Sequence, residues 1–256
     1  MSVRLSVVDL DGVGQETTFS FDGHPGAIIR LRKQFSAYYF SVVDVHTSTD
    51  ETKLAVVISI KPHESCPYPD ALGYRVAFVD LTTGDVQVCC YSDREYLSGS
   101  YSGNGRTFHA LFKGLTKSLP VSLQTYQTSL GGQWEFATIT YLSMMPLFLS
   151  LQYPTRKGEI KIQTSFDGTK VLLVDPTYGA SSGRIYVFNR VGFDYLLLQT
   201  LEPHGNTRTD TWCKQFGHSH EYKIKDNGQR ELLLVKNEEG ELFKYELTSS
   251  GFFKPL

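Results

Sequence analysis

Short apolar stretches recur along this chain, and a turn that contains Asp or Asn stands before each of them. The clearest stretches are Lys53–Ile60, Lys170–Asp175 and Glu231–Lys236, and two fainter ones are Thr17–Phe21 and Thr107–Phe112. The corresponding turns contain Asp50, Asp167-Gly168, Asn227-Gly228, Asp11-Gly12 and Asn104-Gly105. Asp-Gly and Asn-Gly favour tight hairpin turns, because those turns need a positive φ that Gly adopts freely and Asn or Asp tolerate. The pattern therefore predicts β-strands that are entered from hairpins.

Further strand-like segments surround each clear stretch. Those that follow directly are Tyr74–Leu81, Arg184–Arg190 and Glu241–Leu247, and after another turn come Val86–Tyr91, Tyr195–Leu201 and Phe252–Leu256. A first strand is indicated where Ser6-Val7-Val8-Asp9 is echoed by Ser41-Val42-Val43-Asp44. Helical periodicity is nearly absent, which excludes crossover helices and a parallel sheet. The sequence thus predicts repeated units of four antiparallel strands.

Such a unit cannot bury both of its faces alone, whereas units stacked around an axis cover one another. The turns recur about 40 to 60 residues apart, near the length of one propeller blade. The 256 residues therefore predict an all-β fold, a small β-propeller of five blades with four antiparallel strands each, in a single domain. The blades are expected at residues 1–34, 35–93, 94–154, 155–203 and 204–256. Gly131-Gly132 and Pro146 interrupt the third range, so a ring of four blades and a β-sandwich are alternatives.

Motifs in the fourth unit resemble a known repeat. Gly183–Arg190 reads Gly-Arg-Ile-Tyr-Val-Phe-Asn-Arg, a strand ending in Gln199-Thr200-Leu201 follows, and Phe216-Gly217 comes next. This stretch resembles the FG-GAP repeat, and Val79–Gly84 is similar to the end of a WD-repeat strand with its turn. The resemblance covers about a fifth of the chain and implies propeller blades, but the fold hosts many roles and implies no single function.

Composition and charge narrow the choice of partners. Hydrophobic residues make up 41% of the chain and aromatic residues 13%, which suits half-buried strands. The formal net charge is −2, without the excess of Lys and Arg that a phosphate backbone needs, so we expect no nucleic-acid partner. The longest apolar run, Tyr141–Leu151, cannot cross a bilayer and the N-terminus has no signal core, so we expect a soluble, intracellular protein without membrane insertion. Four cysteines without paired spacing are expected to be free thiols: Cys66, Cys89, Cys90 and Cys213.

Two strings hold residue types that bind metals. Asp9, Asp11 and Glu16 would offer oxygen ligands to calcium, as FG-GAP blades in integrin-like proteins do, but these ligands are too few and a plain hairpin turn explains the string equally well. His218 and His220 would share one face of a strand, but the usual zinc spacing is absent and solvated surface histidines explain them as well. We expect no metal and no cofactor.

Carboxylates on first strands raise an enzymatic alternative. Asp9 and Asp44 occupy matching positions on strands that line the central channel of a propeller, where five-bladed glycosidases place two carboxylates, one as acid and one as nucleophile or base. Asp also caps turns, which explains both residues without chemistry. A carbohydrate-binding or glycoside-hydrolysing propeller that uses these channel-lining carboxylates is therefore the alternative function.

The leading expectation is a non-catalytic protein-interaction or structural module, because no nucleophile elbow or phosphate loop is present. Propeller loops present a broad, rigid face that suits docking to another protein. The longest polar loops are Pro62–Leu72 and Glu202–Trp212, and they contain residue types enriched at binding hot spots: Tyr68, Arg208 and Trp212. The expected partners are other protein subunits, within a large assembly such as a virion or an organellar complex.

Overall fold

Strands and turns make up the part of the chain that the structure describes. The computed structural model describes residues 3–10, 14–21, 24–32, 38–62, 73–113, 121–142, 160–175, 183–201, 217, 219–225, 229–237 and 239–256, and no helix occurs in these ranges. The three clear apolar stretches form β5 (Lys53–Pro62), β13 (Lys170–Asp175) and β17 (Arg230–Lys236). Each begins within one residue of the position that the preceding turn predicts.

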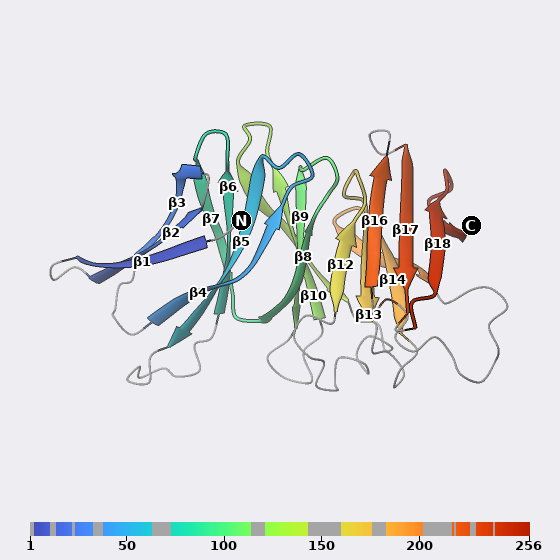
Figure 1. Ribbon diagram of the computed structural model, residues 1–256, viewed down its shortest axis with the longest axis horizontal. Helices are drawn as coiled ribbons and strands as arrows, with labels where there is room; N and C mark the ends of the chain where they lie inside the picture. The colour runs from blue at the N-terminus through green and yellow to red at the C-terminus, as the bar shows by residue number, and fades with distance from the viewer. Residues whose placement is uncertain are drawn as a thin grey trace. The chain divides into compact units, whose positions relative to one another are not determined.

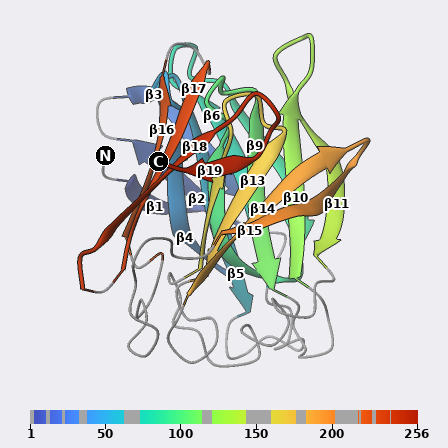
Figure 2. The same cartoon turned by 90° about the vertical axis from the view of Figure 1, so that its right-hand side faces the viewer.

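Five antiparallel sheets follow one another along the chain; most of their strands are labelled in Figure 1, and β11, β15 and β19 are labelled in Figure 2. The first comprises β1 (Val3–Leu10), β2 (Gly14–Phe21) and β3 (His24–Arg32). The second comprises β4 (Tyr38–Thr47), β5, β6 (Gly73–Asp80) and β7 (Val86–Ser92). The third comprises β8 (Glu95–Tyr101), β9 (Thr107–Lys113), β10 (Val121–Thr128) and β11 (Trp134–Leu142). The fourth comprises β12 (Lys161–Thr164), β13, β14 (Arg184–Val191) and β15 (Asp194–Leu201), and the fifth β16 (Ser219–Lys225), β17, β18 (Leu242–Leu247) and β19 (Phe253–Pro255).

Each strand pairs with the next strand in the chain, so every sheet is an up-and-down meander, as in a propeller blade. The structure confirms the predicted fold class: the chain is all-β and built from four-stranded antiparallel sheets of the β-propeller type, with three strands described in the first sheet. The third predicted blade, residues 94–154, had the least regular sequence pattern. Its described strands β8 to β11 form the same meander as the other sheets, and Gly132 belongs to the β10–β11 turn. The assignment of the whole chain to a single domain stays a prediction.

The turn between the first and second strands has the same hydrogen bonds in three sheets. In the β12–β13 turn the Ser165 hydroxyl donates to Asp167 Oδ1 at 2.8 Å and accepts the Lys170 N–H at 2.9 Å. Ser48 and Ser102 make the equivalent two bonds in the β4–β5 and β8–β9 turns. A Ser two residues before the Asp or Asn is therefore part of the repeat.

The fourth residue of each of these turns has a positive φ: 78° at Gly168, 66° at Gly105 and 58° at Glu51. Residues with a Cβ pay about 1–2 kcal/mol for this left-handed conformation, which explains the glycines in two of the three turns. Glu51 keeps the same backbone geometry at a strained position.

Two units can be distinguished, and each has its own core. Unit 1 comprises Met1–Glu95 and Thr128–Phe136, and unit 2 comprises Tyr96–Gln127 and Ala137–Leu256. In unit 1, one face of the second sheet forms an apolar cluster whose buried members are Leu54, Val56, Ile58, Ala77 and Val79. On the opposite face the ring of Phe78 stacks on Trp134, with centroids 4.1 Å apart.

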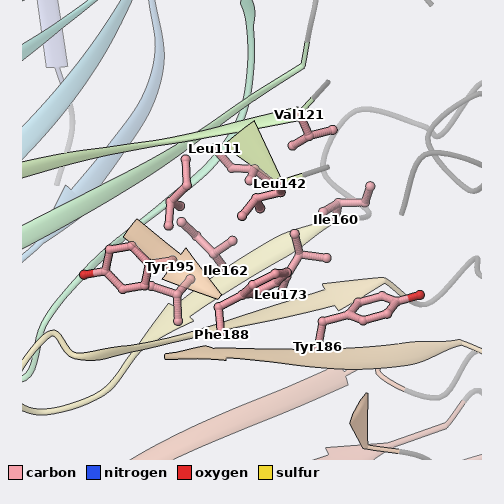
Figure 3. Packing of buried hydrophobic residues seen from close by; sticks show 11 residues of the cluster. Leu111, Val121, Leu142, Ile160, Ile162, Leu173, Tyr186, Phe188 and Tyr195 are labelled. Carbon is pink, nitrogen blue, oxygen red and sulfur yellow. The ribbon is translucent and has the colours of Figure 1, made fainter. Parts of the chain in front are cut away.

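In unit 2 the fourth sheet is covered on both faces. One face packs against the third sheet, and Figure 3 shows Leu111 and Leu142 of the third sheet facing Phe188 and Tyr195 of the fourth. The other face packs against the fifth sheet, in a cluster that includes Leu172, Val174, Val187, Leu233, Val235 and Phe253. Burial on both faces explains why β13 is a continuous apolar run rather than an alternating one.

Candidate functional site

The outer strands of the third and fourth sheets, β11 and β15, flank an apolar groove in unit 2. The groove has a volume of about 330 Å³, and its lining comes from Ile139, Thr140, Tyr141, Leu142, Phe188, Asp194, Tyr195, Leu196 and Leu197. Among the strands that the structure describes, β11 and β15 are each the last in their sheets, so one edge of each has no described neighbouring strand in its own sheet. We call this cavity the β11–β15 groove.

Tyr195 holds the two walls of the groove together. Its backbone N–H donates to the Thr140 hydroxyl across the groove at 3.3 Å. Its own hydroxyl donates to the Gly168 carbonyl oxygen at 2.8 Å. Burial raises the pKa of Tyr195 to about 12, so the phenol remains protonated and able to donate. The wall formed by β15 is therefore fixed at two points of Tyr195, its backbone N–H and its side-chain hydroxyl.

A buried histidine continues this network beneath the groove. His109 on β9 is fully buried, with Nε2 2.7 Å from the Tyr195 hydroxyl and Nδ1 3.2 Å from Thr164 Oγ1. Because the Tyr195 hydroxyl already donates to Gly168, it accepts from Nε2–H, and Nδ1 accepts from the threonine. Burial, with a smaller contribution from the positive charge of Arg190, lowers the pKa of His109 to about 3. This neutral imidazole joins the third and fourth sheets and supports the groove.

Exposed apolar side chains lie on the two strands that line the groove and on the adjoining β14–β15 hairpin. Tyr141 on β11 is 51% exposed and Leu196 on β15 is 55% exposed. The hairpin that joins β14 and β15 adds Val191 at 56% and Phe193 at 74%. In Figure 2 the tip of this hairpin extends outward past β11. We call the groove together with Tyr141, Val191, Phe193 and Leu196 the β11–β15 surface.

The hairpin tip is held in a defined shape. Val191 pairs with Asp194, which leaves Gly192 and Phe193 as a two-residue turn. Gly192 has a φ of 66°, as the first central residue of a type II′ turn requires. Arg190 Nε donates to the Gly192 carbonyl oxygen at 3.0 Å, which fixes the guanidinium beside the tip. The exposed position of Phe193 is thus imposed by the turn.

A second polar cluster lies on β4 in unit 1. His46 Nε2 is 3.0 Å from Asp44 Oδ2, and Asp44 Oδ1 accepts the Val45 N–H at 2.9 Å. Ser41 of β4 pairs with Ser59 of β5, and their hydroxyl oxygens are 2.6 Å apart. The carboxylate of Asp44 is therefore paired with an imidazole, a partner that sequence reasoning missed although the two residues stand at the i, i+2 spacing of one strand face.

Several residues expected from the sequence lie outside the described residues. They are Tyr68, Arg208 and Trp212 of the predicted contact loops, together with Asp11 and His218, and the same holds for the side chain of Asp9. His220 is described, and its Nε2 lies 3.4 Å from Gln163 Nε2. The pairing of Asp9 with Asp44 in a glycosidase site stays a prediction.

Within the described ranges no group of three or more His, Cys, Asp or Glu residues could hold a metal ion. The same ranges contain no helix long and apolar enough to cross a membrane.

No family model and no curated protein matches this sequence. Solved structures with similar folds include TolB from Acinetobacter baumannii, with 11% identity, 99% of this chain and 52% of that chain covered, and a TM-score of 0.41. The WD40 domain of Toxoplasma gondii coronin has 11% identity, coverages of 98% and 66%, and a TM-score of 0.42. The β-propeller domain of the Trilobed protease from Pyrococcus furiosus has 10% identity, coverages of 86% and 57%, and a TM-score of 0.44.

The chain spans about half the length of the TolB structure it matches. The similar structures also include enzymes, among them prolyl endopeptidases and a periplasmic gluconolactonase from Pseudomonas aeruginosa. The likeness assigns no activity to this chain.

Proposed function

We propose that this chain is a non-catalytic protein-interaction module that binds a partner subunit through the β11–β15 surface. One observation carries the proposal: an apolar groove opens between β11 and β15, and four exposed apolar side chains lie on these strands and on the hairpin that joins β14 to β15, namely Tyr141, Val191, Phe193 and Leu196. Single exposed apolar residues are normal on protein surfaces, but several of them beside an apolar groove are typical of interaction sites. Burying the patch against a partner removes it from water.

The construction of the surface supports the same function. A docking site needs walls that do not rearrange on binding, since ordering mobile groups lowers the affinity. The groove has such walls, because Tyr195 is bonded to Thr140, Gly168 and His109 and its ring lies in the core between two sheets. Rigid aromatic residues with an apolar surround are the usual anchors of protein interfaces.

The proposal includes the assembly expected from the sequence. The partner is another protein subunit in a large intracellular particle, such as a virion or an organellar complex, and the fourth sheet is an FG-GAP-like blade. Tyr68, Arg208 and Trp212 are proposed as additional contact residues. The support for these finer points is the sequence alone: the motif within Gly183–Leu201 and the hot-spot residue types in the two long loops.

The test compares the proteins that co-purify with the full chain from its native source. Leu196→Asp places a charge at the mouth of the groove without touching the core, and Leu242→Asp is the matched control, since Leu242 is 45% exposed on β18 of the fifth sheet. We expect a stoichiometric partner with the wild type and the control that is lost with Leu196→Asp, and that rebinds as purified protein with the same dependence. Identical partners for all three proteins would contradict the proposal.

A further inference from the structure

We propose that one face of the fifth sheet binds an extended acidic segment of another protein. This face belongs to a different sheet from the β11–β15 surface, so the inference is independent of the proposed function. Two observations lead to it. The face has an excess of positive charge, and it carries a row of lysines whose spacing matches that of alternate side chains in an extended chain.

The two faces of the fifth sheet, drawn in red in Figure 1, differ in character. One face is apolar and buried against the fourth sheet, with Leu233, Val235 and Phe243 among its residues. Successive side chains of a strand point to opposite faces, so the residues between these point away from the fourth sheet. The burial of β17 alternates accordingly, because Leu232 and Leu234 are only half-buried. We call this second face the lysine face.

The lysine face has a strong excess of positive charge. On it the strands β16–β19 place six of the 25 basic residues of the chain and only two of its 27 acidic residues, although the formal net charge is −2. The basic residues are Lys223, Lys225, Arg230, Lys236, Lys244 and Lys254, and the acidic ones are Glu221 and Glu246. Charge of one sign gathered on one surface attracts a partner of the opposite sign.

Most of this charge is not neutralised within the described part of the chain. Glu246 accepts a hydrogen bond from Arg230 Nε at 2.6 Å. Glu221 Oε1 lies 3.2 Å from Lys223 Nζ. Both glutamates are therefore engaged, and among the described residues no ion pair involves the remaining four lysines: Lys225, Lys236, Lys244 and Lys254.

Three of these lysines form a diagonal row across the sheet. Lys236 of β17 pairs with Leu242 of β18, two positions before Lys244. Lys254 of β19 pairs with Glu246, two positions after Lys244. Diagonal neighbours on one face of a sheet are about 7–8 Å apart. Alternate side chains of an extended chain point the same way at intervals of about 7 Å, so a segment with acidic residues at alternate positions matches the row.

A protein segment fits this face better than a nucleic acid or a membrane does. No residue that β16–β19 place on the face is aromatic, so bases would find no stacking surface. Its single arginine, the residue type best suited to phosphates, is engaged by Glu246. Leu232 and Leu234 are half-buried among the lysines, which suits contact with the apolar atoms of a peptide rather than insertion into a bilayer.

Fluorescence anisotropy of the purified full chain with a labelled peptide of about ten alternating Glu and Thr residues measures this binding. We expect saturable binding that weakens as the salt concentration rises from about 20 to about 200 mM, and no binding of a peptide in which Lys replaces Glu. A Glu-Thr peptide that does not bind saturably would overturn the inference. Tighter binding of an oligothymidylate of similar length, or of vesicles of phosphatidylcholine and phosphatidylserine, would also overturn it.

Charge reversal locates the site. Lys244→Glu/Lys254→Glu should weaken peptide binding at least about tenfold, and Lys244→Gln/Lys254→Gln, which adds no repulsion, at least about threefold. The control Lys61→Glu/Arg75→Glu makes the same change in net charge as the Glu variant, at exposed positions of the second sheet, and should stay within about twofold of the wild type. Equal weakening by the control would contradict the site. Circular dichroism and thermal unfolding show that each variant is folded.

One comparison separates the lysine face from the β11–β15 surface. Leu242 pairs with Lys236 on the lysine face, so Leu242→Asp should weaken peptide binding and keep the partner that depends on Leu196. Leu196→Asp should have the reverse effect. Peptide binding that depends on Leu196 and not on Leu242 would refute the lysine face. Absence of a Leu196-dependent partner would refute the proposed function and leave the lysine face standing.

Discussion

The imidazole of His109 is fully buried between the third and fourth sheets, so its titration couples the stability of the fold to pH. Its pKa in the folded chain is about 3, against an ordinary value of 6.5 that the unfolded chain is expected to show. The folded state therefore binds fewer protons than the unfolded state below about pH 6.5. Above that pH His109 does not lower the free energy of unfolding. As the pH falls toward 3, the free energy of unfolding decreases, because the unfolded chain takes up a proton that the folded chain does not.

The size of the effect follows from the two pKa values. One pKa unit corresponds to about 1.4 kcal/mol. Between about pH 7.5 and pH 5, the unfolded imidazole takes up its proton while the folded one stays neutral, which lowers the free energy of unfolding by about 2 kcal/mol. His220, whose pKa is lowered to about 4 by burial and by the charge of Lys161, acts in the same direction and must be held constant.

The assay compares wild type with His109→Gln by urea denaturation at both pH values. The glutamine amide does not titrate and can still bond the Tyr195 hydroxyl, while His220 is present in both proteins and cancels in the comparison. We expect His109→Gln to be less stable than wild type near pH 7.5 and to lose about 2 kcal/mol less of its stability on going to pH 5. Equal losses in the two proteins would refute the buried, neutral imidazole and the sheet contact it makes.

Three further substitutions test the repeated turns, each by urea denaturation at neutral pH. Ser165→Ala removes a buried hydroxyl that makes two hydrogen bonds and should lower the free energy of unfolding by about 1–3 kcal/mol; an unchanged value would contradict the role of the serine. Gly168→Ala should cost about 3 kcal/mol, because φ is 78° and a Cβ would lie 2.9 Å from Thr107 Oγ1, against about 1 kcal/mol for Gly240→Ala, where φ is 85° and the space is open. Equal costs for the two alanines would contradict the close approach. Glu51→Gly should raise stability by up to about 1 kcal/mol, since it relieves the left-handed strain at φ 58°, and any loss would show that the side chain contributes more than the strain.

The strands were predictable because apolar stretches and turn residues follow simple local rules. β13, for example, is Lys170–Asp175 in the sequence analysis and in the structure. The serines at positions 48, 102 and 165 were an available signal that the sequence analysis did not use. Each stands two residues before the Asp or Asn of its turn, and including them makes the repeat sharper than the Gly turns alone.

The candidate site was not predictable from the sequence. Whether a face of an outer strand is buried depends on the adjacent sheet, and the strand's own residues do not reveal this. Leu196-Leu197-Leu198 on β15 is a uniform apolar run that indicates a buried strand. In the structure Leu197 packs against the core between the sheets while Leu196 is exposed, and an irregularity in the β14–β15 pairing skips Leu198. Likewise, no local pattern joins His109 to Tyr195, which are 86 positions apart and meet only because the sheets stack.

The most direct test of the β11–β15 surface as a contact site is site-specific photo-crosslinking. A photoreactive phenylalanine analogue would replace Phe193 in the full chain, and the same analogue at Leu242 would serve as the matched position outside the surface. We predict a discrete crosslinked product from position 193, mapped by mass spectrometry to one partner protein, and no crosslink to that protein from position 242. If position 193 yields no product beyond that of position 242, the surface is not a binding site.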